Sequence, residues 1–361
     1  MTKLRVAILY GGRSAEHEVS VVSARSVMAA IDRSKYEVVP IAITKAGRWI
    51  LPEKTPEQLE APKGSLPGTG EAGTGVTLTR EPSGAELKPL EGATGGLGTI
   101  DVVFPVLHGP YGEDGTVQGM LELAGVAYVG AGVLASGLGM DKEMQKQLFA
   151  ARGLPVVPYV HVHVEDWQRS SESVIELAAD EIGLPCFTKP ARLGSSIGVS
   201  KCSTPDQLRR GIALALEHDD KILIEKAITG RELECAVLGN ADPEASIVGE
   251  IVAHHDFYDF EAKYIEEGSE LLIPAPIPDN ISEEIRVLAV EAFRAIDCAG
   301  MARVDFFYEE ATGAILVNEI NTIPGFTPIS MYPKLWEATG IPYAKLIDRL
   351  IELALDNHGG R

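Results

Sequence analysis

The chain has 361 residues, 45% hydrophobic and 23% charged, as in a globular protein with two or three domains. Its net charge of −20 excludes nucleic acid and anionic membranes as principal partners, although a local group of lysines could still bind a nucleotide. No apolar run is long enough to span a bilayer, and the amino terminus does not resemble a signal peptide. The four cysteines are widely spaced, so we expect reduced thiols in a cytoplasmic protein.

The first part of the chain alternates between strand and helix patterns. We predict strands at residues 5–9, 37–43, 102–107 and 127–130. This alternation predicts an N-terminal α/β domain with a parallel sheet over residues 1–139. Residues 61–75 are rich in glycine and proline, and we expect them to form a mobile surface insertion outside the core.

Two further units follow, over residues 140–230 and 231–361. The second unit is predicted to contain strands at 156–164, 185–189, 198–202 and 222–226, and helices at 142–152, 173–182 and 205–217. The third is predicted to contain strands at 234–238 and 247–251, a polar aromatic loop at 254–268, and helices at 282–296 and 343–355.

Two further strand patterns near the end of the chain carry polar residues at alternate positions. Arg303 and Asp305 share one face of the first strand, and Glu319 and Asn321 share one face of the second. A hairpin across the turn at 309–313 would bring the four side chains together. Two carboxylates and an amide oxygen suit Mg²⁺ or Mn²⁺ with phosphate groups as further ligands. This pattern indicates an enzyme that uses a nucleotide.

Two segments of the second unit are candidate nucleotide contacts. Lys189 ends a strand and is followed by a glycine-serine loop through Gly198, where backbone N–H groups could approach phosphate oxygens. The loop lacks the Walker A spacing, so an ordinary turn with a solvated lysine remains open. The strand 222–226 leads into Gly230, Arg231 and Glu232, which could hold an adenosine. Taken alone, the residues after strand 222–226 are more typical of a charged, solvent-exposed strand end than of an adenosine site.

Two loops of the first domain are candidate sites for a small substrate. Residues 11–18 form a turn from strand to helix, where a small anion or zwitterion could bind, although Glu16 and Glu18 could simply complement the helix dipole. The turn lacks the GxGxxG spacing of a dinucleotide site. His108 follows a parallel strand, at the end where open α/β sheets bind ligands. The other histidines show no zinc spacing.

Together these segments resemble the D-alanine–D-alanine ligase family of the ATP-grasp superfamily. The resemblance covers nearly the whole chain through eight ordered motifs: GGRSAEHEVS, LHGPYGEDGTVQGMLE, GMDK, KPARLGSSIGVSK, IEKAITGRELE, FYDFEAKY, ARVDFF and NEINTIPGFTPIS. It implies central and C-terminal ATP-grasp subdomains after the N-terminal domain, with ATP bound between two antiparallel sheets. It also implies that ATP phosphorylates the carboxylate of one D-alanine, and that the amine of a second D-alanine attacks the acyl phosphate.

The resemblance also implies a role for particular residues. The metal ligands would be Asp305, Glu319 and Asn321, with Glu319 bridging two ions of Mg²⁺ or Mn²⁺. The contacts to ATP would be Lys142, Lys189, Ser195, Glu225, Lys226, Ile228, Glu232, Phe257, Lys263 and Asn318. Arg303 and the N–H of Gly325 would form an oxyanion site. Glu16 would accept the ammonium of the first D-alanine, with His108 close by. The carboxylate of the second would lie at Ser330 and Met331.

The loop at 254–268 carries a further implied contact. Ser195 and Tyr264 would bond to Glu16 when this loop closes. Phe260 stands where many relatives have tyrosine, and Ile323 occupies a variable position. Neither difference removes a charged or coordinating group.

Three alternative functions are less consistent with these residues. A D-alanine–D-lactate ligase would use the same fold and metals, and only the loop chemistry, with Tyr264 typical of dipeptide ligases, argues against it. A regulatory protein without activity is disfavoured because every expected ionic residue is present. A nicotinamide dehydrogenase is disfavoured by the missing GxGxxG. The resemblance also favours a homodimer.

Overall fold

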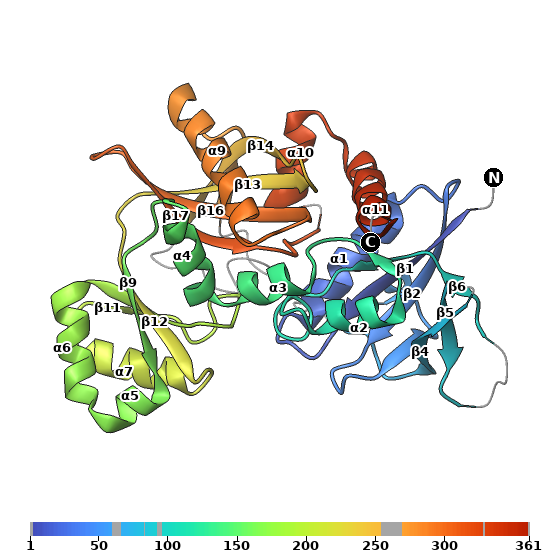
Figure 1. The fold of residues 1–361 in the computed structure, drawn as a ribbon, viewed down its shortest axis with the longest axis horizontal. Coiled ribbons are helices and arrows are strands. Elements are labelled where there is room, and N and C mark those ends of the chain that lie inside the picture. The colour runs from blue at the N-terminus through green and yellow to red at the C-terminus, as the bar shows by residue number, and fades with distance from the viewer. Residues whose placement is uncertain are drawn as a thin grey trace.

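The computed structural model describes residues 3–59, 66–82, 84–91, 96–253, 269–327 and 329–359. Its strands form three sheets that follow one another along the chain (Figure 1). The N-terminal sheet has the order β6 (Thr99–Ile100), β5 (Gly84–Pro89), β4 (Gly73–Glu81), β3 (Trp49–Pro52), β2 (Tyr36–Ile43), β1 (Leu4–Gly11), β7 (Val102–Pro105) and β8 (Ala127–Tyr128).

The N-terminal sheet is parallel in one half and antiparallel in the other. Strands β2, β1, β7 and β8 are parallel, as the sequence predicts, and helices α1 (His17–Ala30) and α2 (Thr116–Ala124) connect neighbouring strands. The antiparallel strands β3 to β6 were not predicted. Their short apolar runs are too weak to be recognised without their pairing partners.

Of the described residues in the segment 61–75, which is predicted to lie outside the core, residues 68, 70–72 and 74 are exposed, but others pack against the N-terminal domain. Thr69 is buried, and its backbone N–H donates to Nε2 of His17 at 3.2 Å. Residues 73–75 begin strand β4, where Gly75 is opposite Ile50 of β3. Glycine-rich composition therefore did not mark a free loop here. A short 3₁₀ helix, η1 (Pro56–Gln58), precedes this segment.

The central sheet is antiparallel and covered by helices on one face. Its order is β11 (Ser200–Cys202), β10 (Cys186–Pro190), β12 (Lys221–Lys226) and β9 (Tyr159–His163). The accompanying helices are α5 (Val164–Arg169), α6 (Ser171–Glu181) and α7 (Pro205–Leu216). Helix α7 begins where the sequence predicts, because the Thr204 side chain accepts from the N–H of Gln207 and Pro205 occupies the first turn.

The C-terminal sheet is also antiparallel. Its order is β15 (Ser269–Leu272), β14 (Glu244–Ala253), β13 (Arg231–Gly239), β16 (Gly300–Glu309) and β17 (Ala314–Asn321). Helices α9 (Asp279–Ala295), α10 (Met331–Thr339) and α11 (Tyr343–Gly359) belong to this part of the chain. Helix α11 returns to the N-terminal sheet, where Leu346 and Leu350 share a core with Ile8 (Figure 1). No described helix is both long and apolar enough to cross a membrane.

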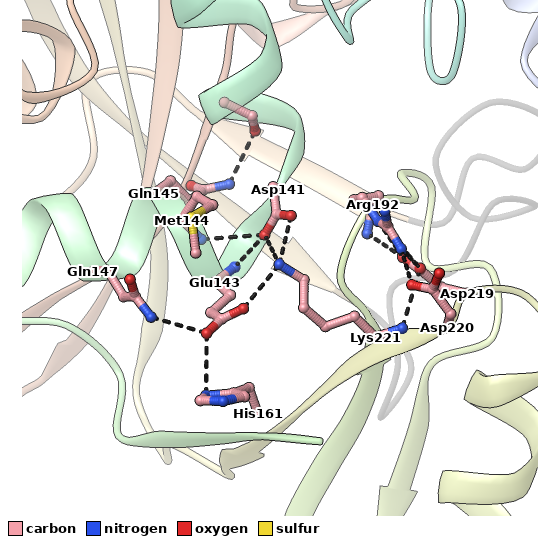
Figure 2. A network of polar contacts seen from close by, with 11 residues as sticks. Asp141, Glu143, Met144, Gln145, Gln147, His161, Arg192, Asp219, Asp220 and Lys221 are labelled. Atoms are coloured by element: carbon pink, nitrogen blue, oxygen red, sulfur yellow. Dashed lines mark hydrogen bonds and ion pairs between the residues drawn. The ribbon is translucent and has the colours of Figure 1, made fainter. Parts of the chain in front are cut away.

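Helices α3 (Val133–Met140) and α4 (Lys142–Ala151) run from the N-terminal sheet towards the other two (Figure 1). Asp141 stands between them, and its side chain accepts from the N–H groups of Glu143 and Met144 at the start of α4. Lys221, at the start of β12, contacts Asp141 at 2.6 Å and Glu143 at 2.8 Å, as Figure 2 shows. The ion pairs of Asp141 and Glu143 with Lys221 hold the start of α4 against the central sheet.

The Asp141 side chain combines a helix cap with a buried ion pair, and two variants separate these contributions. Asp141→Asn keeps an oxygen that can cap α4 but loses the charge, whereas Asp141→Ala loses both. We expect Asp141→Ala to lower the free energy of unfolding by about 2 kcal/mol or more, because it loses both the cap and the ion pair. The loss for Asp141→Asn should be smaller than that for Asp141→Ala by about 1 kcal/mol, the contribution of the cap. Urea unfolding measures both.

The control is Asp220→Ala, which removes a largely exposed carboxylate from Arg192 nearby and should change stability by less than about 1 kcal/mol. Equal losses for Asp141→Asn and Asp141→Ala would mean that the cap contributes nothing.

Candidate active site

A cavity of about 450 Å³ lies where the three sheets converge, and it is lined by residues of all three units. Every predicted site residue within the described ranges lines this cavity: Glu16, His108, Lys142, Lys189, Ser195, Glu225, Lys226, Ile228, Glu232, Arg303, Asp305, Asn318, Glu319, Asn321, Gly325, Ser330 and Met331. Phe257, Lys263 and Tyr264 lie outside the described residues. Residues that are far apart in the sequence thus share one chamber.

The pairing of β16 with β17 brings the predicted metal ligands together. Asp305 is opposite Glu319, and Arg303 is opposite Asn321, with an irregular register just after Asp305. The amide nitrogen of Asn321 donates to Oδ2 of Asp305 at 3.0 Å. The hairpin predicted from the sequence is therefore present, with its polar side chains facing the cavity.

Arg303 holds two carboxylates at once. Its Nε and one terminal nitrogen each donate to an oxygen of Asp305 at 2.7 Å, and Nε also lies 3.0 Å from Oε2 of Glu234. Although burial lowers it, the carboxylates of Asp305 and Glu234 hold the pKa of Arg303 well above its ordinary value. The guanidinium is a permanent positive charge at the floor of the cavity.

The donor set of the hairpin fits a hard divalent cation. Asp305, Glu319 and Asn321 supply carboxylate and amide oxygens from neighbouring positions, which are the ligands that Mg²⁺ and Mn²⁺ prefer. Among the described residues, no group of three or more His, Cys, Asp and Glu side chains gathers in a metal-binding arrangement. The chain therefore offers a partial set, which phosphate oxygens could complete.

Two lysines of the central unit reach the cavity from different elements. Lys142, the first residue of α4, donates to the carbonyl oxygen of Leu193 at 2.6 Å and lies 3.6 Å from Oε2 of Glu319. Lys189, on β10, lies 2.5 Å from Oε2 of Glu225 on β12. Positive charge is thus concentrated beside the glycine-serine loop and the carboxylate of Glu319 on β17.

The glycine-serine loop contacts the first domain directly. Ser195 and Ser196 adopt positive φ angles of 50° and 59°, which non-glycine residues rarely adopt. In this conformation the hydroxyl of Ser195 donates to Oε1 of Glu16, the residue that precedes α1. The strained backbone therefore coincides with a contact between two units at the cavity.

His108 is buried and fixed as a neutral ring. Its Nδ1 lies 3.1 Å from the carbonyl oxygen of Ile323, so Nδ1 carries the proton, and its Nε2 lies 3.4 Å from the hydroxyl of Ser23. Burial lowers the pKa of His108, despite the opposing charge of Glu16. The neutral imidazole joins the N-terminal domain to the loop after β17.

That loop brings a backbone amide close to a hydroxyl. A side chain at Gly325 would meet the hydroxyl of Ser330 at 2.9 Å, so glycine permits this approach. The same hydroxyl accepts from the N–H of Thr327 at 3.0 Å. Met331 begins α10 directly after this turn. Gly325, Thr327 and Ser330 thus line the same cavity as Arg303.

Three further residues at or behind the cavity were missed in the sequence. Glu113 accepts from the N–H groups of Gly109 at 2.6 Å and Ile323 at 3.3 Å. Glu234 approaches Arg303, and Lys146 ion-pairs with Glu225. Glu113 and Glu234 both lie in motifs of the family resemblance, and Glu234 alternates with Glu232 along its strand, so both carried a usable signal. Lys146 follows Lys142 by one helical turn, which alone does not distinguish a buried lysine from a solvated one.

Two antiparallel sheets around a cavity with lysines and paired carboxylates define an ATP-grasp enzyme, and the comparisons identify the family. Family models described as the N-terminus and C-terminus of D-ala D-ala ligase match residues 5–131 and 148–352. The chain belongs to the D-alanine–D-alanine ligase family.

Individual relatives match over almost their whole length. The chain is 52% identical over 365 residues to a D-alanine–D-alanine ligase of Mycolicibacterium vanbaalenii, covering 98% of this chain and 97% of the relative. The structure of the D-alanine–D-alanine ligase from Coxiella burnetii superposes with a TM-score of 0.86 at 36% identity, covering 100% and 96% of the two chains. The structure of the VanG D-Ala:D-Ser ligase from Enterococcus faecalis superposes with a TM-score of 0.83 at 34% identity, covering 98% of this chain and 100% of that chain.

The partly buried carboxyl of Glu113 should make stability depend on pH. Burial, followed by the charge of Glu16, raises the pKa of Glu113 to about 8 from its ordinary value of 4.5. Between these values the folded protein keeps a proton that the unfolded chain loses, so this group's contribution to stability falls as pH rises. Glu113→Gln cannot ionise, so its free energy of unfolding should improve relative to wild type from pH 5 to pH 8.

Chemical denaturation at several pH values measures this difference. Glu217→Gln, at an exposed position, controls for the loss of a carboxylate. A wild-type curve that stays parallel to the Glu113→Gln curve over this range would contradict the expectation.

Proposed function

We propose that this protein joins two molecules of D-alanine to D-alanyl-D-alanine, converting ATP to ADP and phosphate through an acyl phosphate. One observation carries the proposal: a chain about half identical to curated D-alanine–D-alanine ligases brings all the described site residues to one cavity. The dipeptide would serve as a precursor of peptidoglycan. The activity of the VanG relative with D-serine makes the second substrate the point to be tested.

The proposed roles follow the charges along the cavity. Glu16 accepts the ammonium of the first D-alanine, beside neutral His108. Arg303 and the N–H of Gly325 stabilise the oxyanion that forms when the second amine attacks the acyl phosphate. Ser330 and Met331 lie at the carboxylate of the second D-alanine. Fixed donors need no rearrangement when this charge develops.

The nucleotide would occupy the space between the central and C-terminal sheets. Lys142 and Lys189 are the proposed phosphate contacts, with Ser195 in the loop that follows Lys189. The adenosine would contact Glu225, Lys226, Ile228 and Glu232, with Asn318 completing the nucleotide site from β17. The proposal includes Phe257 and Lys263 as further ATP contacts and Tyr264 as a partner of Glu16. For Phe257, Lys263 and Tyr264, the proposed roles rest on family membership alone.

We include two Mg²⁺ or Mn²⁺ ions, held by Asp305, Glu319 and Asn321, in the proposal. The oxygen donors described above support this assignment. When bound, such ions neutralise the β- and γ-phosphates of ATP during transfer. Asp305 already bonds to Arg303, so the same carboxylate would face both the metal and the oxyanion site.

The remaining proposals concern organisation. We divide the chain at 1–139, 140–230 and 231–361, and the three separate sheets support these boundaries. Family membership favours a homodimer in the cytoplasm. D-Alanine and ATP are the expected partners, with no role for nucleic acid or membrane.

The reaction is tested by ADP release with D-alanine, D-lactate and D-serine, singly and in competition with D-alanine. We expect ADP release to depend on D-alanine, and D-alanyl-D-alanine to be the main product at neutral pH. Mass spectrometry of the products identifies the second substrate. Mainly D-alanyl-D-lactate would support the alternative ligase, whereas no ADP release with D-alanine would contradict the proposal as a whole.

Glu319→Gln tests the metal site. The change replaces a carboxylate oxygen that could bridge two ions by an amide nitrogen, so we expect an intact fold and loss of most ADP formation. Binding of Mn²⁺ to the ADP complex, followed by electron paramagnetic resonance, should weaken in parallel. Glu337→Gln, in an exposed position on α10, is the matched control. Near-normal turnover of Glu319→Gln with Mg²⁺ would contradict the assignment.

A further inference from the structure

Lys146 is a buried lysine directly behind the cavity. Its side chain is only 1% exposed, and it lies one turn after Lys142 on α4. Its Nζ donates to the carbonyl oxygen of Asn318 at 2.9 Å and lies 3.1 Å from Oε1 of Glu225. Both partners line the cavity. Lys146 therefore touches two proposed nucleotide contacts from the protein side.

Glu225 is shared between two lysines. Lys146 lies at Oε1, and Lys189 lies 2.5 Å from Oε2. Although burial raises it, the charges of Lys146 and then Lys189 keep the pKa of Glu225 below its ordinary value. Burial lowers the pKa of Lys146 and the charge of Glu225 opposes this; for Lys189, although burial lowers its pKa, the charge of Glu225 raises it overall. The geometry places the carboxylate between the two lysine ammonium groups. Two positive charges and one negative leave one net positive charge.

The exposed fractions of the three side chains show which of them presents the net positive charge to a ligand. The Lys146 side chain is 1% exposed, Glu225 is 3% exposed, and Lys189 is 16% exposed and lines the cavity. Charges interact more strongly in the interior than in water, so Glu225 responds to both lysines. A ligand in the cavity can approach only Lys189 of the pair. With Lys146 neutral, Glu225 would offset the charge of Lys189 almost completely.

We propose that Lys146 is a positioning residue for nucleotide binding, whose buried charge compensates Glu225 and leaves Lys189 available to a phosphate group. The bond from Lys146 to Asn318 also holds β17 of the C-terminal sheet beside β12 of the central sheet. The inference rests on the proposed function, because it takes a nucleoside polyphosphate as the occupant of the cavity. Lys189 would thus bind phosphate tightly because of Lys146, a residue that the nucleotide does not touch.

Binding of adenosine and of ADP to Lys146→Met, measured by isothermal titration calorimetry, tests this electrostatic role. Methionine keeps most of the side-chain volume but removes the charge. We expect ADP to bind about tenfold more weakly or worse, and adenosine to change by less than about threefold, because adenosine carries no phosphate. Equal weakening of both ligands would reduce Lys146 to a structural residue, and unchanged affinity for ADP would also overturn the proposal.

A second variant tests the charge balance directly. In the double variant Lys146→Met with Glu225→Gln, Lys189 is again the one charge of the three residues, and glutamine keeps an oxygen acceptor for the adenine. We expect its affinity for ADP to recover towards wild type. Lys221→Met is the matched control, since it removes another ion-paired lysine, at the start of β12, without touching Glu225. It should lose stability but keep the ratio of ADP to adenosine affinity.

The outcomes for the proposed function and for Lys146 are separable. A double variant that binds ADP no better than Lys146→Met would overturn the charge-balance argument. Wild-type protein that does not bind ADP would overturn both proposals. Wild-type protein that binds ADP but releases none from ATP with D-alanine would count against the ligase reaction alone, and the affinities would still decide the role of Lys146.

Discussion

Charge compensation inside one cavity is the constraint on which the site depends. Burying an unpaired carboxylate or ammonium group costs several kcal/mol, so each charged group needs a partner before any substrate arrives. Arg303 takes Asp305 and Glu234, and Glu225 takes Lys146 and Lys189. These pairs hold the side chains close to the positions from which phosphates and cations would be bound. The protein thus supplies its own counter-ions in the absence of ligand, and binding must exchange partners.

The fold satisfies this constraint largely by supplying the members of a pair from different elements, the pair of Arg303 with Asp305 within β16 being the exception. Arg303 and Asp305 lie on β16, whereas Glu234 lies on the neighbouring β13. Glu225 on β12 meets Lys146 from α4 and Lys189 from β10. Because the pairs of Arg303 with Glu234 and of Glu225 with the two lysines cross between elements, they fix the relative positions of those elements. Rigid elements with crossing ion pairs are a suitable support for a site that must keep its geometry during phosphoryl transfer.

The sequence predicted the parts of the site that depend on local periodicity. Alternation along β16 and β17 was sufficient to place Arg303 and Asp305 on one face, and their pairing with β17 follows from a short turn. Lys146 was missed because its role depends on Glu225, which is 79 positions away, and helical spacing alone does not distinguish a buried lysine from a solvated one. The burial of Thr69 depends on His17, another long-range contact. Local patterns cannot report such partners.

The distribution of charge along the cavity also has a direction. Lys142, Lys189 and Arg303 contribute positive charge beside the two ATP-grasp sheets, each next to a carboxylate of the same sheets, whereas the side of the N-terminal domain contributes only the carboxyl groups of Glu16 and Glu113 among the described charged residues of the cavity. The raised pKa of Glu113 reflects this second concentration, since burial and then Glu16 disfavour its ionised form. A zwitterionic amino acid placed between them would turn its ammonium towards Glu16 and its carboxylate towards the cations. That orientation presents the carboxylate, and not the amine, to the phosphates, which is the order that formation of an acyl phosphate requires.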